Sequence, residues 1–393
     1  MAPLTPDFAD YEWSAISRAE LLNGFVVVGW PDGAELACYS LWLAENCEGL
    51  GLDPTTRESM IDPADLPRPE DLTSAEVGAD GRLVLHWQLE AGPKQTSVHP
   101  GWLRHVADGQ HHPQYRFPPQ EPWTAASLVE PPSLDGSTIL DDDRVLLNWL
   151  ILLVRYGLAR LQHCPTSESF VAELTRRIGP IRGSNFGEVF TVRARHEADS
   201  TAYTGLRLGQ HTDLPTRETP PGFQFLHCTE NSVAGGWSRM TDGLTVVAEL
   251  REHYPADYEA LTTLNWGFLN RSPTEEHRWC GPIIDHVQGS MPLTLRAFYP
   301  VRAFPHMDQS DIPRAYAAMR RFSAVAHDDR FQLSYPFEPG DMVGFDNRRV
   351  LHGRDAFEPG AGTRILQGCY LDHDDLYSRF RVLVRRHGTR PAP

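Results

Sequence analysis

Residues 345–354 read Phe-Asp-Asn-Arg-Arg-Val-Leu-His-Gly-Arg, and residues 210–213 read Gln-His-Thr-Asp. In a strand or at its end, residues two apart project to the same side, so His211 and Asp213 can converge on one point. His352, far later in the chain, can supply a third ligand from another strand of the same barrel. Two imidazoles and one carboxylate suit non-haem Fe(II) and leave positions open for a co-substrate and dioxygen. The pattern predicts that His211, Asp213 and His352 hold iron.

Arg364 follows His352 and is expected on the returning strand, within reach of the same cavity. Its planar guanidinium suits bidentate pairing with a carboxylate, which is how the distal carboxylate of 2-oxoglutarate would be bound. An isolated His-X-Asp is usually an ordinary strand end, and an isolated arginine is usually a surface charge. The ordered set of His-X-Asp, distant histidine and trailing arginine is much more specific.

From about residue 186 onward, the sequence pattern is typical of short strands separated by turns that contain Gly and Pro. Such a pattern predicts a sandwich or jelly roll rather than alternating βαβ units. Apolar residues at helical spacing predict two amphipathic helices before it, at residues 141–160 and 167–177. The clearest strands are expected at residues 223–227, 293–298, 343–345 and 364–371.

A chain of 393 residues is too long for one ordinary core. Proline is dense near residues 111–132, which marks a boundary because proline interrupts both helix and strand. We predict a small β-containing domain at residues 14–108, with strands at 24–30 and 82–87, then a Pro-rich linker at 109–132. Residues 133–390 are then expected to form the catalytic domain.

Composition narrows the class of protein. A formal charge of −16 repels phosphate backbones, so no nucleic-acid partner is expected. The richest apolar run, residues 146–153, is too short to cross a membrane. The N-terminus lacks the features of a secretory signal, and six scattered cysteines show no CxxC pair. We expect a cytoplasmic protein with reduced thiols.

Further motifs extend over nearly the whole chain. They are Thr-Ala-Tyr-Thr at 201–204, Phe-Leu-His-Cys at 225–228, Gly-Gly at 235–236, Thr-Asp-Gly at 241–243, Leu-His-Gly-Arg at 351–354, Gly-Cys-Tyr-Leu at 368–371 and Ser-Arg at 378–379. Together with the iron motif they resemble the γ-butyrobetaine and trimethyllysine hydroxylase family, a branch of the taurine-dioxygenase-like 2-oxoglutarate oxygenases. Trp-Pro-Asp-Gly at 30–33 and Leu-Trp-Leu-Ala-Glu-Asn-Cys at 41–47 are similar to that family's small N-terminal domain.

The resemblance implies a mainly β fold with flanking helices, in which the catalytic domain is a double-stranded β-helix (jelly roll). It implies Fe(II) on His211, Asp213 and His352, 2-oxoglutarate on Arg364, and dioxygen as the oxidant. The implied reaction hydroxylates an unactivated C–H bond of a small molecule and releases succinate and CO2. A homodimer is also implied, because the family often dimerises.

The resemblance also implies an aromatic cage for a trimethylammonium group, at positions occupied here by Phe186, Phe190, Tyr203 and Tyr370. Aromatic faces attract quaternary ammonium, although Phe is a weaker partner than Trp. The alternative is that these rings are core, or line a pocket for an apolar or aromatic group.

At the other end of the implied pocket, Ser200 and Tyr299 replace asparagines that the butyrobetaine enzymes use near the substrate carboxylate. A pocket built to hydrogen-bond one group discriminates against partners that lack it. We therefore expect a cationic amine, amino acid or betaine-like substrate other than γ-butyrobetaine.

Family members usually bind a structural zinc through three cysteines and a histidine, but only Cys47 remains here. Tetrahedral zinc needs about four ligands, so no structural zinc is expected.

Three other functions remain open. The same cofactors can support desaturation or another oxidative outcome, whereas Asp213 argues against a halogenase, which generally lacks that carboxylate. A non-catalytic binding protein on the same barrel would have no need of the full ligand set. A cupin-like isomerase would have no evident use for Arg364.

Overall fold

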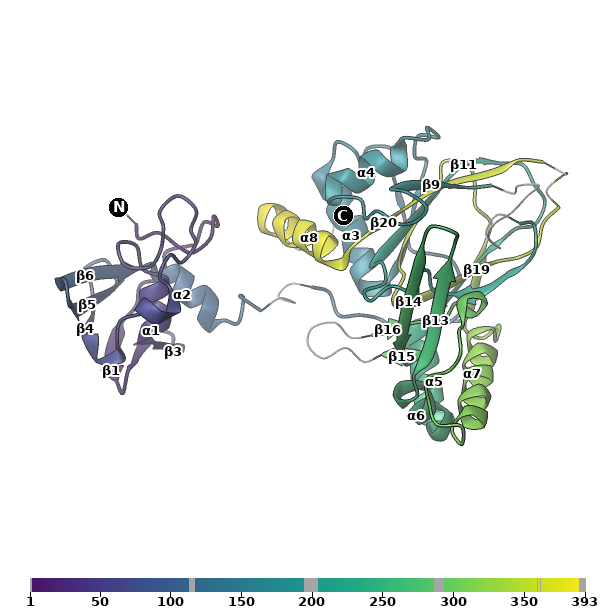
Figure 1. The fold of residues 1–393 in the computed structure, drawn as a ribbon. Helices are drawn as coiled ribbons and strands as arrows, with labels where there is room; N and C mark the ends of the chain where they lie inside the picture. Colours follow the sequence, from purple (N-terminus) through teal and green to yellow (C-terminus); the bar gives the residue numbers. More distant parts are fainter. Residues whose placement is uncertain are drawn as a thin grey trace. The chain divides into compact units, whose positions relative to one another are not determined.

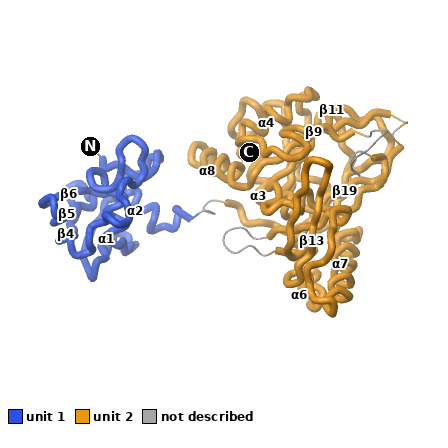
Figure 2. The backbone as a smooth tube through the Cα atoms, viewed as in Figure 1, with its two compact units in different colours: residues 1–115 blue, residues 116–393 orange. Residues whose placement is uncertain are grey.

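The computed structural model describes residues 2–112, 117–193, 204–285, 293–358, 360 and 362–388. The chain packs into two compact units, residues 1–115 and 116–393, which are coloured separately in Figure 2. Ser200 and Tyr203 lie outside the described residues. None of the described helices is long and apolar enough to cross a membrane.

Unit 1 contains two antiparallel three-stranded sheets. Asn23 and Gly24 join the first two strands in a two-residue turn, and both have positive φ, at 51° and 79°. This is the backbone geometry that tight hairpins prefer. A buried cluster that includes Val26, Leu43 and Trp87 forms the core of the unit. Its elements are β1 (Arg18–Leu22), β2 (Phe25–Gly29), β3 (Glu35–Tyr39), α1 (Ser40–Glu45), β4 (Leu72–Val77), β5 (Leu83–Leu89), β6 (Gly92–Val98) and α2 (Pro100–Ala107).

Unit 2 is built on two sheets whose neighbouring strands come from distant parts of the sequence. The six-stranded sheet has the order β7 (Ser133–Asp135), β8 (Leu158–Gln162), β18 (Met342–Asp346), β11 (Phe223–Asn231), β20 (Arg364–Leu371) and β9 (Val189–Val192). The four-stranded sheet has the order β10 (Leu208–His211), β19 (Val350–Arg354), β12 (Ser238–Asp242) and β17 (Gln332–Tyr335). All of these pairings are antiparallel except that of β7 with β8.

Three helices cover one face of the six-stranded sheet, namely α3 (Asp143–Tyr156), α4 (Phe170–Ile178) and α8 (His373–His387) (Figure 1). Along β11, Phe223 and Phe225 pack into the core beneath these helices, while Gln224 and Leu226 line a cavity on the opposite face. This alternation is the two-residue period of a strand with both faces buried.

A second group of elements packs around another core. It consists of α5 (Gly243–His253), α6 (Pro255–Thr263), α7 (Ile312–Ala326), the hairpin of β13 (Trp266–Arg271) with β14 (Glu276–Gly281), the pair β15 (Ile284–Asp285) and β16 (Thr294–Leu295), and the turn Tyr299–Val301. Figure 1 shows the hairpin running beside α5 and α7.

The helix expected at residues 141–160 ends earlier, because Gly157 adopts a left-handed φ of 68° as its cap. Residues 158–162 then form β8 and pair with β18. The helix expected at 167–177 is found as α4.

Candidate metal centre and its cavity

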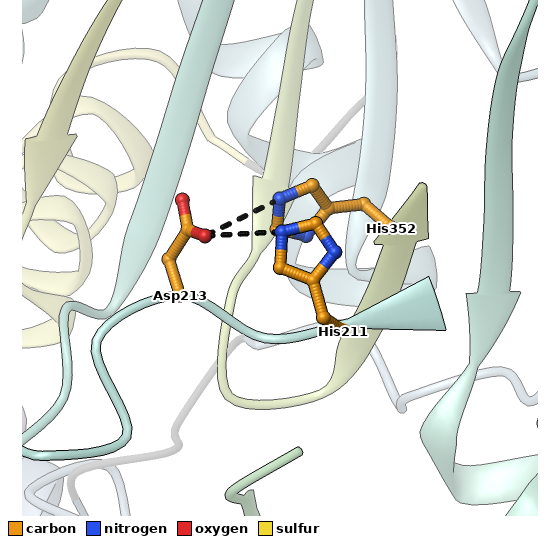
Figure 3. Close-up of side chains that lie close together, drawn as sticks. All are labelled: His211, Asp213 and His352. Atoms are coloured by element: carbon orange, nitrogen blue, oxygen red, sulfur yellow. Dashed lines mark ion pairs between the residues drawn. The ribbon is translucent and has the colours of Figure 1, made fainter. Parts of the chain in front are cut away.

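Two histidines face each other across neighbouring strands. His211 of β10 and His352 of β19 are directly opposite in the antiparallel register, and their ring centroids are 4.1 Å apart. Directly opposed residues bring their Cβ atoms within about 5 Å, so register alone brings the two imidazoles together. Asp213 follows β10, and its Oδ1 lies 3.3 Å from Nε2 of His211 and 3.7 Å from Nε2 of His352 (Figure 3). One ligand atom from each residue lies within 4.8 Å of the other two.

Hydrogen bonds to its backbone fix the position of Asp213. The fully buried amide of Asn347 accepts from the Asp213 N–H at 2.7 Å and donates to the Asp213 carbonyl at 3.1 Å. The next residue, Leu214, has a φ of 53°, which a branched side chain rarely adopts. A strained backbone conformation of this kind persists only where surrounding contacts enforce it. The two hydrogen bonds between Asn347 and the neighbouring Asp213 backbone are such contacts.

The carboxylate is oriented by a tyrosine. The Tyr370 hydroxyl donates to Oδ2 of Asp213 at 2.7 Å, which leaves Oδ1 directed at the two imidazoles. Burial opposes ionisation of Asp213, but the charges of His352 and His211 and the bond from Tyr370 outweigh it, so its pKa lies well below the usual range. The centre therefore holds an ionised carboxylate.

Each imidazole directs its Nε2 atom toward Asp213. Nδ1 of His211 lies 2.9 Å from the Gly209 carbonyl, which can only accept, so Nδ1 carries a proton and Nε2 is the nitrogen left for a metal. Burial, reinforced by the charge of His211, lowers the pKa of His352 to about 3. Two imidazoles and a carboxylate within 4.8 Å fit a divalent ion with open coordination positions.

A cavity of about 870 Å³ opens beside this cluster. The six-stranded sheet contributes lining residues such as Gln224 and Leu366, and the four-stranded sheet contributes Ser238 and Met240. The tip of the β13–β14 hairpin, residues 270–275, forms a polar part of the lining. The volume falls within the usual range for pockets that bind small molecules, about 300–1,000 Å³.

Arg364 is a buried guanidinium on the wall of this cavity, with 5% of its surface exposed. Among the described residues it forms no ion pair, and its Nε has no hydrogen-bond partner. Burial lowers its pKa, but an arginine remains charged. A second lining guanidinium, Arg354, has its pKa lowered to about 10 by burial and by the charge of Arg364. Two buried positive charges fit a carboxylate ligand.

The aromatic residues named from the sequence fall in different places. Phe186, Phe190 and Tyr370 all line the cavity and form a row, with ring centroids 6.1 Å and 5.2 Å apart. Tyr299 does not line the cavity, since its ring packs against the core around α5 and α7 and its hydroxyl is buried. Its neighbour Phe298 lines the cavity instead, 5.0 Å from the ring of His211.

Asn347 and the hydroxyl of Tyr370 have contacts at the site that the sequence alone did not indicate. Asn347 stood in a recognised motif, yet its bonds to Asp213 depend on a loop 134 residues away. No sequence spacing could have indicated that contact.

Comparisons with known proteins agree with this geometry. Residues 117–370 match the family model described as "Taurine catabolism dioxygenase TauD, TfdA family". A γ-butyrobetaine dioxygenase from Pseudomonas sp. (strain AK-1) is 39% identical over 94% of this chain and 96% of that protein. The human γ-butyrobetaine dioxygenase is 26% identical over 94% of this chain and 98% of that protein.

Among solved structures, a taurine dioxygenase from Burkholderia xenovorans is 15% identical with a TM-score of 0.47, covering 62% of this chain and 88% of that one. The family-model match spans more than half of the chain. This chain therefore belongs to the TauD, TfdA family of dioxygenases.

Proposed function

We propose that this protein hydroxylates an unactivated C–H bond of a small cationic molecule of the betaine kind. It is a dioxygenase that uses Fe(II) and 2-oxoglutarate and releases succinate and CO2. The observation that carries the proposal is the cluster of His211, Asp213 and His352 at the wall of a cavity that also holds the buried charge of Arg364.

The assignment of roles follows from the donor atoms. His211, Asp213 and His352 would bind Fe(II) through two Nε2 atoms and Oδ1. Arg364 would pair with the distal carboxylate of 2-oxoglutarate. The oxidising power would come from iron held there together with 2-oxoglutarate and dioxygen. Tyr370 keeps Oδ2 of Asp213 occupied, so Oδ1 is the oxygen that would be free to bind an ion.

Apolar side chains around the centre serve to exclude water from it. Leu214, Leu226 and Met240 line the cavity beside polar groups. A dry pocket strengthens the electrostatic interactions inside it and suppresses side reactions of a reactive oxidant.

A cationic substrate is supported by the aromatic row of Phe186, Phe190 and Tyr370, because ring faces attract quaternary ammonium. The names of the two relatives reported above also support a betaine. We propose Ser200 and Tyr203 as further substrate contacts. Phe298 and Pro300, which line the cavity beside Tyr299, cannot hydrogen-bond a carboxylate through their side chains. This supports a substrate that differs from γ-butyrobetaine at that end.

The two sheets of unit 2 support a double-stranded β-helix, because residues from both contribute to one cavity. We propose that residues 133–390 form this catalytic domain, residues 109–132 a linker, and residues 14–108 a small separate domain. We also propose that the protein is cytoplasmic, forms a homodimer and binds no structural zinc.

The decisive experiment is a screen for succinate release with Fe(II), ascorbate and 2-oxoglutarate against betaines, trimethylated amino acids and amines. We expect one cationic compound to raise succinate release well above the uncoupled background. The mass of the product distinguishes hydroxylation, which adds one oxygen atom, from desaturation, which removes two hydrogens.

The matched control is His211→Ala, which should abolish succinate release and leave the fold intact. Wild-type succinate release by this variant would overturn the iron assignment. Ligand binding without any turnover would instead favour a non-catalytic binding protein.

A further inference from the structure

The strand that presents His211 is weakly held by its own sheet. β10 is at the edge of the four-stranded sheet, and its pairing with β19 is interrupted by a register shift between Leu208 and His211. Residues 209 and 210 lie within that interruption. An edge strand with a bulge has backbone groups that the sheet cannot satisfy, so something else must fix its geometry.

His327 supplies this support from outside the sheet. It follows α7 as the C-cap residue, and its Nε2 accepts a hydrogen bond from the Gln210 N–H at 3.0 Å. Its Nδ1 lies 2.7 Å from the Ser323 carbonyl, which can only accept. Nδ1 therefore carries the proton, and Nε2 has the lone pair that the strand requires.

The bulge fixes the orientation of the metal-binding imidazole. The Gly209 carbonyl accepts from Nδ1 of His211 at 2.9 Å, which directs Nε2 toward Asp213. Gly209 is itself confined on two sides. A Cβ on Gly209 would lie 3.0 Å from Nε2 of His327, and a Cβ on Gly353 would lie 3.2 Å from the Gly209 carbonyl.

We propose that His327 is a positioning residue for the metal, acting on His211 through the backbone of Gly209 and Gln210. Two hydrogen bonds separate α7 from the imidazole, one to the Gln210 N–H and one from His211 to the Gly209 carbonyl. Removing a group that orients a metal ligand typically weakens metal binding by about 10- to 100-fold. This inference rests on the proposed role of His211 as a ligand.

The test compares two amides at position 327 in the full-length protein. In His327→Gln, the amide reaches the position of Nε2 and can still accept from the Gln210 N–H. In His327→Asn, the amide reaches only the position of Nδ1 and cannot. We would measure the Kd for Co(II) from the visible absorption of the bound ion, and the charge-transfer band of the anaerobic complex with Fe(II) and 2-oxoglutarate.

We expect His327→Asn to weaken Co(II) binding by about 10- to 100-fold and to shift the charge-transfer band, with His327→Gln within about threefold of the parent. Phe322→Leu is the structural control, because Phe322 is a buried core residue of the same helix. It should lower the melting temperature and leave the Kd unchanged. Equal Kd values for the Asn and Gln variants would overturn the proposal.

Two further variants keep the test decisive. If His327→Asn does not fold, Gly209→Ala probes the same contact with one methyl group, and an unchanged Kd there would also overturn the proposal. His211→Ala tests the ligand role of His211 separately from the positioning role of His327. If it leaves Co(II) binding unchanged, the proposed ligand assignment fails, whereas weakened binding in His211→Ala with no effect at position 327 rejects only the role of His327.

Discussion

The hydroxyl of Tyr370 donates a hydrogen bond of 2.7 Å to Oδ2 of Asp213, so this tyrosine belongs to the metal centre as well as to the aromatic wall. Its ring stacks at a tilt on Phe190, with centroids 5.2 Å apart. One side chain thus joins the carboxylate that would hold iron to the surface that would hold a cation. A shift in the position of Tyr370 is therefore expected to alter both metal binding and cation binding.

Tyr370→Phe removes the hydroxyl and keeps the ring. We expect the Kd for Co(II) to rise about tenfold, because Asp213 loses the group that orients its second oxygen. Optical titration measures this. Tyr377→Phe is the matched control, since Tyr377 lies on α8 and packs against the core beneath the helices. An equal effect of both substitutions would show that the hydroxyl of Tyr370 does not orient the carboxylate.

Arg364→Lys keeps the charge and loses the planar pair of donors. We expect 2-oxoglutarate to bind about 10- to 100-fold more weakly, which corresponds to about 1.5–3 kcal/mol for a hydrogen-bonded charge. Calorimetry on the Mn(II)-loaded protein measures the change, and the affinity for Mn(II) alone should stay the same. Unchanged binding of 2-oxoglutarate would place the co-substrate elsewhere in the cavity.

Asn347→Asp replaces the amide by a carboxylate of the same shape. The new oxygen faces the carbonyls of Asp213 and Pro221, to which Asn347 donates at 3.1 Å and 3.3 Å. We expect a loss of about 2–4 kcal/mol in the free energy of unfolding, because donors to two buried carbonyls disappear. Chemical denaturation of the metal-free protein measures the loss. A change below 0.5 kcal/mol, a threshold typical of ordinary surface sites, would contradict the role of Asn347 as a clamp.

Phe190→Leu removes an aromatic face and retains apolar volume. We expect a trimethylammonium substrate to bind about 2- to 5-fold more weakly, in line with roughly 0.5–1 kcal/mol for a cation over a ring. The control is the neutral tert-butyl analogue of the same compound, whose affinity should change little. Equal losses for the charged and neutral ligands would show that Phe190 contributes packing alone.

The histidines and the carboxylate could be named from the sequence because their chemistry depends on local spacing and on one register. His211 and Asp213 are two residues apart, and pairing of β10 with β19 brings in His352. The strand β8 was missed because the residues Leu-Ala-Arg-Leu-Gln at 158–162 continue the helical apolar pattern of α3. Only the left-handed conformation of Gly157 separates the two elements.

The supports of the site could not be predicted in the same way. Asn347 and His327 act through contacts with residues 134 and 117 positions away, and each contact depends on where a loop or helix end packs. Tyr299 illustrates the reverse case, because its two neighbours line the cavity while its own ring packs against the core. A position in a motif does not fix the direction of its side chain.

The β13–β14 hairpin contributes residues 270–275 to the cavity but lies outside the four-stranded sheet whose strands β10 and β19 carry His211 and His352. Part of the cavity wall is thus separate in sequence from the residues that would bind iron. We expect changes in the length or sequence of this turn to alter the cavity more than the positions of His211, Asp213 and His352. The turn at residues 270–275 is therefore a suitable region in which to redesign the cavity for a new substrate.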